Sequence, residues 1–420
     1  MAHQQPDDGT AAAAGPAARR PRIDGVDAAR ALAVIGMFTV HLGVDSFGLL
    51  PQEGAEHLHT LLRGNSSALF ALLAGLSLAF MTGRTAPLSG DPWRRAAVRI
   101  LTRALIIGLL GVFLDFLGTP VAIILTYYAG YFVLALPLSR LGPAALWSVS
   151  GALALLGPGL SYALREALGP FPPRVSSLGS LTEFLLTGYY PAVTFMAFVC
   201  AGMAVGRLDL ASTAVRLRLL AAGAALTVFS YAGSWLLLYP LGGIDRIAAA
   251  DAPGFYGPSA PTGDPALLEA LRAGAEQDMD SVSGQVPTDS WWWLATAAPH
   301  TGTTFEIAQA VGQALVVIVA CVWLAERFRL LMYPLSSVGR MPLTVYSGHL
   351  FAIVVVMALA DPGMPWRAPW LMEGFVLGAV VFAVLWRVTV GRGPMEFVVG
   401  AIADGADTSV EEALRERGTR

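Results

Sequence analysis

Long apolar segments separated by short polar ones run along almost the whole chain. A helix needs about 20 predominantly apolar residues to cross the hydrocarbon core of a bilayer. Segments of about this length occupy residues 29–49, 66–82, 97–117, 120–138, 143–162, 184–205, 218–240, 304–325, 338–360 and 369–389. The pattern predicts an all-α fold, a polytopic transmembrane helix bundle of about ten spans. Two segments fit it least well, because 66–82 is the shortest and 143–162 contains the helix breakers Gly157-Pro158-Gly159.

The composition agrees with this pattern. Hydrophobic residues make up 55% of the 420 residues and charged residues only 14%, whereas soluble domains usually carry about 25% charged residues. Both cysteines, Cys200 and Cys321, lie within apolar segments. We therefore expect neither a disulfide framework nor a cysteine metal site, and no metal ion elsewhere.

The loop arginines give the spans a direction. With the amino terminus inside, arginine-bearing loops alternate with arginine-poor ones, as the positive-inside rule requires. The inner loops carry Arg84, Arg94, Arg95, Arg99, Arg140, Arg207, Arg216, Arg218, Arg327 and Arg329. An even number of spans returns the carboxyl terminus to the same side. We predict a multi-pass protein of the plasma (inner) membrane with both termini cytoplasmic.

A long polar stretch divides the chain into two membrane parts. We expect a disordered cytoplasmic tail at 1–21, an N-terminal seven-span bundle at 22–240, an extracytoplasmic loop at 241–302, a C-terminal three-span part at 303–400 and a cytoplasmic tail at 401–420. The loop is mainly acidic, and its turn-rich first half predicts irregular structure. The cluster Trp291–Trp293 predicts an aromatic anchor at the membrane interface.

Four polar side chains lie on one side of the first apolar segment. At 100° per residue, Arg30 and His41 fall within about 20° of each other, and Asp27 and Asp45 fall about 40° to either side. Lipid exposure of such a stripe would cost several kcal/mol. We predict that it faces the protein interior or a water-filled cavity, with His41 and Asp45 as catalytic candidates. For Arg30, a role as helix-end anchor fits equally well.

A second histidine lies in the ninth segment. Arg340 begins that segment on the cytoplasmic side, and His349 follows nine residues later. Because the first and ninth spans both run outward, His41 and His349 should reach a similar depth, and His349 is a further catalytic candidate. Tyr346, one turn before it, is a candidate substrate ligand. Arg340 and His349 fall on opposite faces, so the ninth helix lacks a continuous stripe.

Polar residues also gather at the outer end of the eighth segment. Glu306, Gln309 and Gln313 lie within about 60° of one another on a helix, and His300 comes just before them. Glu306, Gln309 and His300 are candidates for binding a hydroxylated acceptor that enters from outside. Hydrogen bonding between helices explains the polar face equally well.

On the cytoplasmic side, Arg95, Arg99 and Arg103 recur at i, i+4 and i+8. Guanidinium groups bind phosphates bidentately, so these arginines are candidates for holding a nucleotide-bearing donor. The other candidates for this role are Asp27, Arg30 and Arg340. Positive-inside anchoring is the competing explanation. No phosphate-binding loop or dinucleotide fingerprint occurs, so ATP-driven and nicotinamide chemistry are unsupported.

The opening motif resembles a known family. The ten residues between Arg30 and His41 give the arginine-to-histidine spacing of the integral-membrane acyltransferase superfamily. "IDGVDAARALAVIGMFTVHLG" and "NSSALFALLAGLSLAF" resemble the first two helices of its heparan-α-glucosaminide N-acetyltransferase-like branch, and "RALIIGLLGVFL" and "IILTYYAGYFVL" resemble the third and fourth. "PHTGTTFEI", "VGRMPLTVYSGHLF" and "GPMEF" resemble the C-terminal domain of bacterial relatives. The resemblance covers most of residues 22–400.

This resemblance implies acyl transfer across the membrane, from cytoplasmic acyl-CoA, in the simplest case acetyl-CoA, to a sugar or glycolipid on the other side or within the membrane. Arg30 matches the motif arginine, His41 the motif histidine and Asp27 the aspartate before it. Relatives often carry an acidic residue where this chain has Ile123, a departure that bears on activity and donor type.

A neutral imidazole at mid-membrane depth can act as a general base toward the acceptor, or it can carry the acyl group itself. The expected partners are the lipid bilayer, acyl-CoA and a glycan or glycolipid acceptor; nucleic acid is not expected, and a homodimer is left open.

Two other classes of function stay open. A transporter or flippase of a small polar or lipid-linked substrate would line its path with the stripe, although no inverted repeat is present. A non-catalytic scaffold would use the histidines only to bond between helices.

Overall fold

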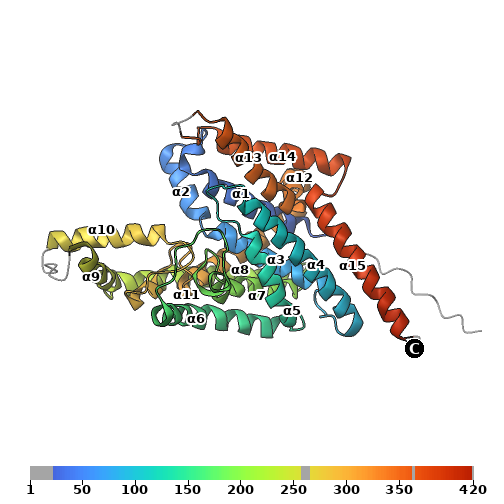
Figure 1. Cartoon of the computed structure of the whole chain (residues 1–420), viewed down its shortest axis with the longest axis horizontal. Helices are drawn as coiled ribbons and strands as arrows, with labels where there is room; N and C mark the ends of the chain where they lie inside the picture. Colours follow the sequence, from blue (N-terminus) through green and yellow to red (C-terminus); the bar gives the residue numbers. More distant parts are fainter. Residues whose placement is uncertain (1–21, 257–264, 362–364, 419–420) are drawn as a thin grey trace, which may run out of the picture.

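The fold is all-helical over the part of the chain that the structure describes. The computed structural model describes residues 22–256, 265–361 and 365–418, and none of these forms a β-strand. The predicted tail at 1–21 lies outside this part. In Figure 1, α9 (Gly243–Tyr256) and α10 (Pro265–Ser281) project at one end of the molecule, and α15 (Pro394–Gly418) lies at the opposite end.

Every predicted span coincides with a helix. Among the described residues, eight helical stretches are long and apolar enough to cross a membrane: α1 (Asp24–Leu42), α2 (Gln52–Leu62) together with α3 (Asn65–Met81), α4 (Gly90–Asp115), α6 (Pro143–Leu168), α8 (Thr213–Leu238), α11 (Thr304–Arg327), α13 (Pro342–Leu359) and α14 (Leu371–Thr389). Two shorter apolar helices are α5 (Leu125–Leu138) and α7 (Ala192–Gly206). The prediction of a polytopic helical bundle is confirmed, with two of its spans shorter than expected.

The sixth helix is not interrupted by its expected breakers. α6 continues through Gly157-Pro158-Gly159 and ends only at Leu168. Gly157 faces α7, where a Cβ atom on it would come within 2.5 Å of the carbonyl oxygen of Val193. The missing side chain therefore lets the two helices approach closely, as small residues do between membrane helices.

The first helix lies at the centre of the packing. A Cβ atom on Gly25 would meet the backbone of Val322 in α11 at 2.3 Å, and one on Gly339 would meet the carbonyl oxygen of Asp27 at 1.6 Å. These two glycines let α11 and α12 (Arg329–Arg340) lie directly against α1. Buried residues of the N-terminal and C-terminal parts belong to one hydrophobic core.

The ninth predicted span is two helices, not one. α12 ends at Arg340, Met341 takes a non-helical conformation, and α13 begins at Pro342. A proline at the first helical position is well suited to such a restart. The prediction that Arg340 and His349 occupy opposite faces of one helix is therefore wrong, because the break lets Arg340 turn toward α1 independently of α13.

The polar stretch between the two membrane parts is more regular than predicted. Helices α9 and α10 occupy much of it, although residues 257–264 lie outside the described residues. The tryptophan cluster forms the short 3-10 helix η3 (Trp291–Ala295). Trp293 is fully buried in a second hydrophobic core and its indole N–H donates to Asp289 at 2.8 Å. Trp293 therefore packs inside the protein, so the prediction of an interfacial anchor does not hold for this tryptophan.

At the other end, α15 continues through most of the predicted cytoplasmic tail; residues 419 and 420 are not described. Asp407 accepts hydrogen bonds from Arg95 of α4 at 2.8 and 3.1 Å, and Asp404 accepts one from Arg99 at 2.6 Å. Glu396 accepts hydrogen bonds from the backbone N–H groups of Leu343 and Thr344 at the start of α13. The helix therefore joins α4 to the helix that carries His349.

Candidate active site

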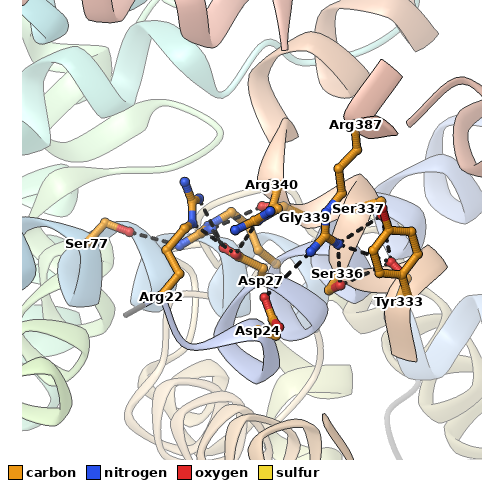
Figure 2. A network of polar contacts seen from close by, with 11 residues as sticks. Arg22, Asp24, Asp27, Ser77, Tyr333, Ser336, Ser337, Gly339, Arg340 and Arg387 are labelled. Carbon is orange, nitrogen blue, oxygen red and sulfur yellow. Dashed lines mark hydrogen bonds and ion pairs between the residues drawn. The ribbon is translucent and has the colours of Figure 1, made fainter. Parts of the chain in front are cut away.

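The amino-terminal end of α1 carries a buried carboxylate surrounded by arginines (Figure 2). Asp27 is 3% exposed. It lies 2.6 Å from Arg30, 3.1 Å from Arg22 and 3.7 Å from Arg340. Arg30 also donates to the carbonyl oxygen of Gly339 at 3.0 Å. One negative charge thus holds three positive ones and joins α1 to α12.

A fourth arginine extends this network toward α14. Figure 2 shows Arg387 reaching back to α12, where it donates to Ser336 at 2.9 Å and Ser337 at 3.0 Å. Its guanidinium lies 4.1 Å from the centre of the Tyr333 ring, a cation–π contact. These bonds fix the position of α12 between α1 and α14.

The arginines line a cavity of about 610 Å³, which we call the inner cavity. Helices α1, α3, α4, α13 and α15 contribute to its walls. Its charged lining consists of Arg22, Arg30, Arg84, Arg99, Arg103, Arg340 and Arg392 with the three acids Asp27, Glu396 and Asp404. The excess of positive charge suits a ligand that carries several phosphates.

The three regularly spaced arginines of α4 do not act as one group. Arg99 and Arg103 line the inner cavity, but Arg95 does not, because its guanidinium is bonded to Asp407. Arg103 donates to the sulfur of Met81 at 2.9 Å, a weak acceptor. The prediction of a three-arginine phosphate site therefore fits Arg99 and Arg103 alone.

At the other end of α1 the two candidate histidines meet. Nδ1 of His41 lies 2.9 Å from Nε2 of His349, and the two rings are stacked with centroids 5.2 Å apart. Phe38 packs against the His349 ring at 4.6 Å, and Tyr346 meets it edge-on at 5.1 Å. His349 is 4% exposed and Tyr346 is 1% exposed. The pair joins α1 to α13 inside an aromatic shell.

His41 is the member of the pair that reaches open space. It lines a cavity of about 560 Å³, the outer cavity, together with His300 and Asp115. His349 and Tyr346 do not line it; they lie behind His41. Tyr346 accepts a long hydrogen bond of 3.5 Å from the backbone N–H of Ile124, and it lines neither the inner nor the outer cavity.

Asp45 is not part of the site. α1 ends at Leu42, and Gly43, with φ +78°, turns the chain into the 3-10 helix η1 (Val44–Ser46). Asp45 lies on that turn, is exposed and lines neither cavity. The prediction that it continues the polar stripe is wrong, because the stripe assumed three more helical residues than the chain forms.

Glu306 and Gln309 also lie elsewhere than predicted. The Glu306 carboxylate accepts hydrogen bonds from the backbone N–H groups of His300 at 3.0 Å and Gly302 at 2.8 Å. It therefore holds the loop that carries His300 and does not line the outer cavity. Gln309 lines a separate cavity of about 480 Å³ beside α8.

His300 itself is placed as predicted, on the outer cavity. Its φ of +60° is uncommon for a residue with a side chain, and the bonds from Glu306 support that conformation. Burial lowers the pKa of its imidazole from 6.5 to about 4, and the nearby Arg63 guanidinium acts in the same direction. His300 is therefore neutral at neutral pH.

Several residues of the outer cavity were not expected from the sequence. Asp115, at the end of α4, accepts a hydrogen bond from the backbone N–H of Ser177 at 3.2 Å and another from its hydroxyl. Ser177 in turn accepts from the backbone N–H of Ile123 at 2.7 Å. Ser177 therefore links the Asp115 carboxylate to the backbone of Ile123. Three arginines also line the cavity: Arg63, Arg174 and Arg367. They occur in loops that the positive-inside rule expects to be poor in arginine, and this exception was the only feature of the sequence that set them apart.

The two cavities are separate in this structure. They share no lining residue among those described. Arg30 and His41 are about 16 Å apart along the helix axis, and the segment between them contains the buried side chains of Val34, Met37 and Phe38. Of these two cavities, only the outer one therefore reaches His41 in this structure.

Comparison with protein families agrees with this arrangement. A family model described as the catalytic domain of heparan-alpha-glucosaminide N-acetyltransferase matches residues 22–241, which is 220 of the chain's 420 residues. The chain belongs to the heparan-alpha-glucosaminide N-acetyltransferase family. A second model, described as a protein of unknown function (DUF418), matches residues 284–405. No curated protein matches the chain.

Membership of the heparan-alpha-glucosaminide N-acetyltransferase family and the apolar helices make this a multi-pass membrane enzyme of the acetyltransferase type. The two matches together cover both histidines: His41 lies in the first and His349 in the second. The contact between the rings therefore joins the two matched regions.

Proposed function

We propose that the protein transfers an acyl group, in the simplest case acetyl, from acyl-CoA in the inner cavity to a sugar amine or hydroxyl in the outer cavity. The observation that carries this proposal is the position of the stacked histidines. One of the two rings forms part of the outer cavity, and both lie on helices whose opposite ends reach the arginine-lined inner cavity.

The inner cavity fits the donor by charge. CoA carries several phosphates, and seven arginines against three carboxylates leave positive charge to bind them. Under the positive-inside prediction this end of α1 faces the cytoplasm, where acyl-CoA is found. The pantetheine arm would then extend along α1 toward His41.

The histidines fit the chemistry by geometry. If the Nδ1–H group of His41 donates its hydrogen bond to Nε2 of His349, Nε2 of His41 keeps its lone pair and can act as a base. It removes the proton of the attacking amine or hydroxyl as the new bond to the acyl carbon forms and the C–S bond breaks. The proton then passes from the imidazolium to the CoA thiolate. His349 holds His41 in the productive tautomer.

The layer between the cavities must open for this step. The side chains of Val34, Met37 and Phe38 fill the space along α1 between Arg30 and His41. We propose that donor binding shifts this layer so that the thioester reaches His41. The acyl group is small enough to cross while the nucleotide stays at the inner end.

The test uses purified protein in nanodiscs with radiolabelled acetyl-CoA and a glucosaminide as acceptor, the sugar class in the family's name. CoA release and labelled product are measured together. His41→Ala should lower kcat by about 10²- to 10⁴-fold, the usual contribution of a general base. His57→Ala is the matched control, since His57 is exposed and lines neither the inner nor the outer cavity.

The second histidine has its own variants. His349→Gln keeps a side chain that can hydrogen-bond to His41, whereas His349→Phe does not, so Gln should retain more kcat than Phe at an unchanged KM for acetyl-CoA. CoA release by His41→Ala equal to wild type would remove the histidine from the mechanism. Movement of intact sugar across a vesicle membrane without CoA release would favour the transporter alternative.

A further inference from the structure

The outer cavity contains arginines that the acyl-transfer chemistry does not use. Arg63 follows α2, Arg174 lies between α6 and α7, and Arg367 lies between α13 and α14, yet all three line the cavity that contains His41. Three segments far apart in the sequence thus bring guanidinium groups to one site.

The arginines of the outer cavity lack an acidic partner at ion-pair distance. Their contacts are with uncharged groups: Arg174 donates to the carbonyl oxygen of Ser283, and Arg367 stacks on the Trp366 ring. Arg272, at the same end of the molecule, pairs with Asp245. By contrast, Arg63, Arg174 and Arg367 take part in none of the ion pairs formed by the described residues. Asp280 attracts Arg63 electrostatically without forming an ion pair with it, so among the described residues no carboxylate is paired with any of the three.

The single acid that lines this cavity does not neutralise them. Asp115 is bonded to Ser177, through both the hydroxyl and the backbone N–H. Three arginines and one carboxylate leave the cavity with an excess of two positive charges. Arginine is also the side chain best shaped for two-pronged bonding to a carboxylate or phosphate.

The contacts of Arg367 place one of these charges close to His41, and those of Arg174 fix its position at the cavity. A Cβ atom on Gly43, two residues after His41, would lie 3.3 Å from Nε of Arg367. Arg174 stacks on the Tyr189 ring at 4.2 Å and donates to the carbonyl oxygen of Ser283 at 2.9 Å, which fixes its direction. A cavity of about 560 Å³ is within the usual size for a small ligand.

We infer that the outer cavity binds an acceptor bearing an anionic group, a phosphate or a carboxylate, and that Arg63, Arg174 and Arg367 hold that group beside His41. This inference rests on the proposed function in that it names the class of the acceptor. The anion fixes one end of the molecule, and the amine or hydroxyl that receives the acyl group lies at the other.

The experiment measures binding without any acyl donor, so it does not depend on catalysis. Isothermal titration of the full-length protein in nanodiscs, at about pH 9 so that the sugar amine is mainly uncharged, compares three probes: glucosamine 6-phosphate, glucuronic acid and glucosamine. The anionic probe that fits should bind at least about tenfold more tightly than glucosamine, because hydrogen bonds to charged groups are the stronger ones. The phosphate and carboxylate probes separate the two anions.

Variants assign the binding to the outer cavity. Replacing Arg63, Arg174 and Arg367 together by glutamine should abolish the preference for the anionic probe, whereas replacing all three by lysine should retain part of it. Arg246→Gln is the matched control, because it removes an arginine at the same end of the molecule from outside the cavity. Near-normal thermal unfolding of the triple glutamine variant checks that it is folded.

Two outcomes would overturn the inference. One is equal affinity for charged and neutral probes. The other is a preference that survives the triple change and disappears with Arg99→Gln and Arg103→Gln, which would place anion binding in the inner cavity. If anionic probes bind as expected but acetyl-CoA is never consumed, the proposed acyl transfer fails while this site remains.

Discussion

The inner and outer cavities lie at opposite ends of α1, and they differ in whether their charged groups are paired. At the inner end, Asp27 is surrounded by three arginines, and Asp404 pairs with Arg99. At the outer end, two imidazole rings are hydrogen-bonded to each other, and the arginines of the cavity form no ion pair among the described residues. The inner charges therefore hold helices together through ion pairs as well as facing a ligand, whereas the outer histidines join α1 to α13 through a hydrogen bond and ring stacking.

This difference predicts unequal costs for removing an acid at each end. Asp27→Ala leaves three arginines without their carboxylate in a buried place, so it should lower the free energy of unfolding by about 3–5 kcal/mol. Asp115→Ala at the outer cavity should cost less, about 1–3 kcal/mol, because it removes hydrogen bonds to Ser177 and no ion pair. Denaturant unfolding of the detergent-solubilised variants measures both, and equal costs would show that the two ends do not differ as described.

A second prediction uses the pH dependence of the outer end. The pKa of His300 is lowered from 6.5 to about 4 in the folded protein, so its contribution to stability is complete above pH 6.5 and is lost as the pH falls toward 4. Going from pH 7 to pH 5 should cost about 1–2 kcal/mol through this group. His300→Asn should remove that part of the pH dependence, since asparagine tolerates the left-handed backbone conformation.

The control for this prediction is His57→Asn, which changes an exposed histidine. Thermal unfolding is followed from pH 7 to pH 4 for both variants and wild type. If the stability of His300→Asn falls with pH as steeply as that of wild type, the pH dependence belongs to another group and not to His300.

The smallest expected effect concerns the inner cavity and α15. Asp404 accepts a hydrogen bond from Arg99, and Arg99 lines that cavity. Asp404→Asn should therefore free the guanidinium to bind a phosphate. The KM for acyl-CoA should fall by about two- to fivefold, which is the energy scale of an exposed ion pair. Asp407→Asn should leave KM unchanged, because its partner Arg95 does not line the cavity. Steady-state kinetics at low and high salt measures both; an equal effect of the two variants would contradict the competition.

Much of the fold followed from the hydrophobic pattern. The length of an apolar segment decides whether it can cross a bilayer, and this property is local, so all ten predicted segments coincide with helices. The helix ends were less predictable. The stripe on α1 failed at Asp45 because Gly43 turns the chain, and the ninth span failed at Met341, where one helix became two.

The candidate site was predicted in part. The periodicity of α1 placed Asp27 and Arg30 together, and the shared direction of the first and ninth spans placed His41 and His349 at a similar depth. The sequence left Glu306 between acceptor binding and structural hydrogen bonding, and it gave no sign of Asp115, because the roles of both depend on which backbone groups lie nearby. Glu306 holds the His300 loop through two N–H groups, and no pattern in the eighth segment indicates that.

The sequence by itself determined that this chain forms membrane helices, which residues of the first helix share a face, and which family it resembles, since each depends on residue type and local spacing. Only the tertiary structure decided that α12 turns Arg340 onto Asp27, that the His41 and His349 rings touch, and that Arg63, Arg174 and Arg367 surround one cavity. Some of these contacts join segments that lie hundreds of residues apart in the sequence. They depend on how the helices pack against one another, which local spacing does not determine.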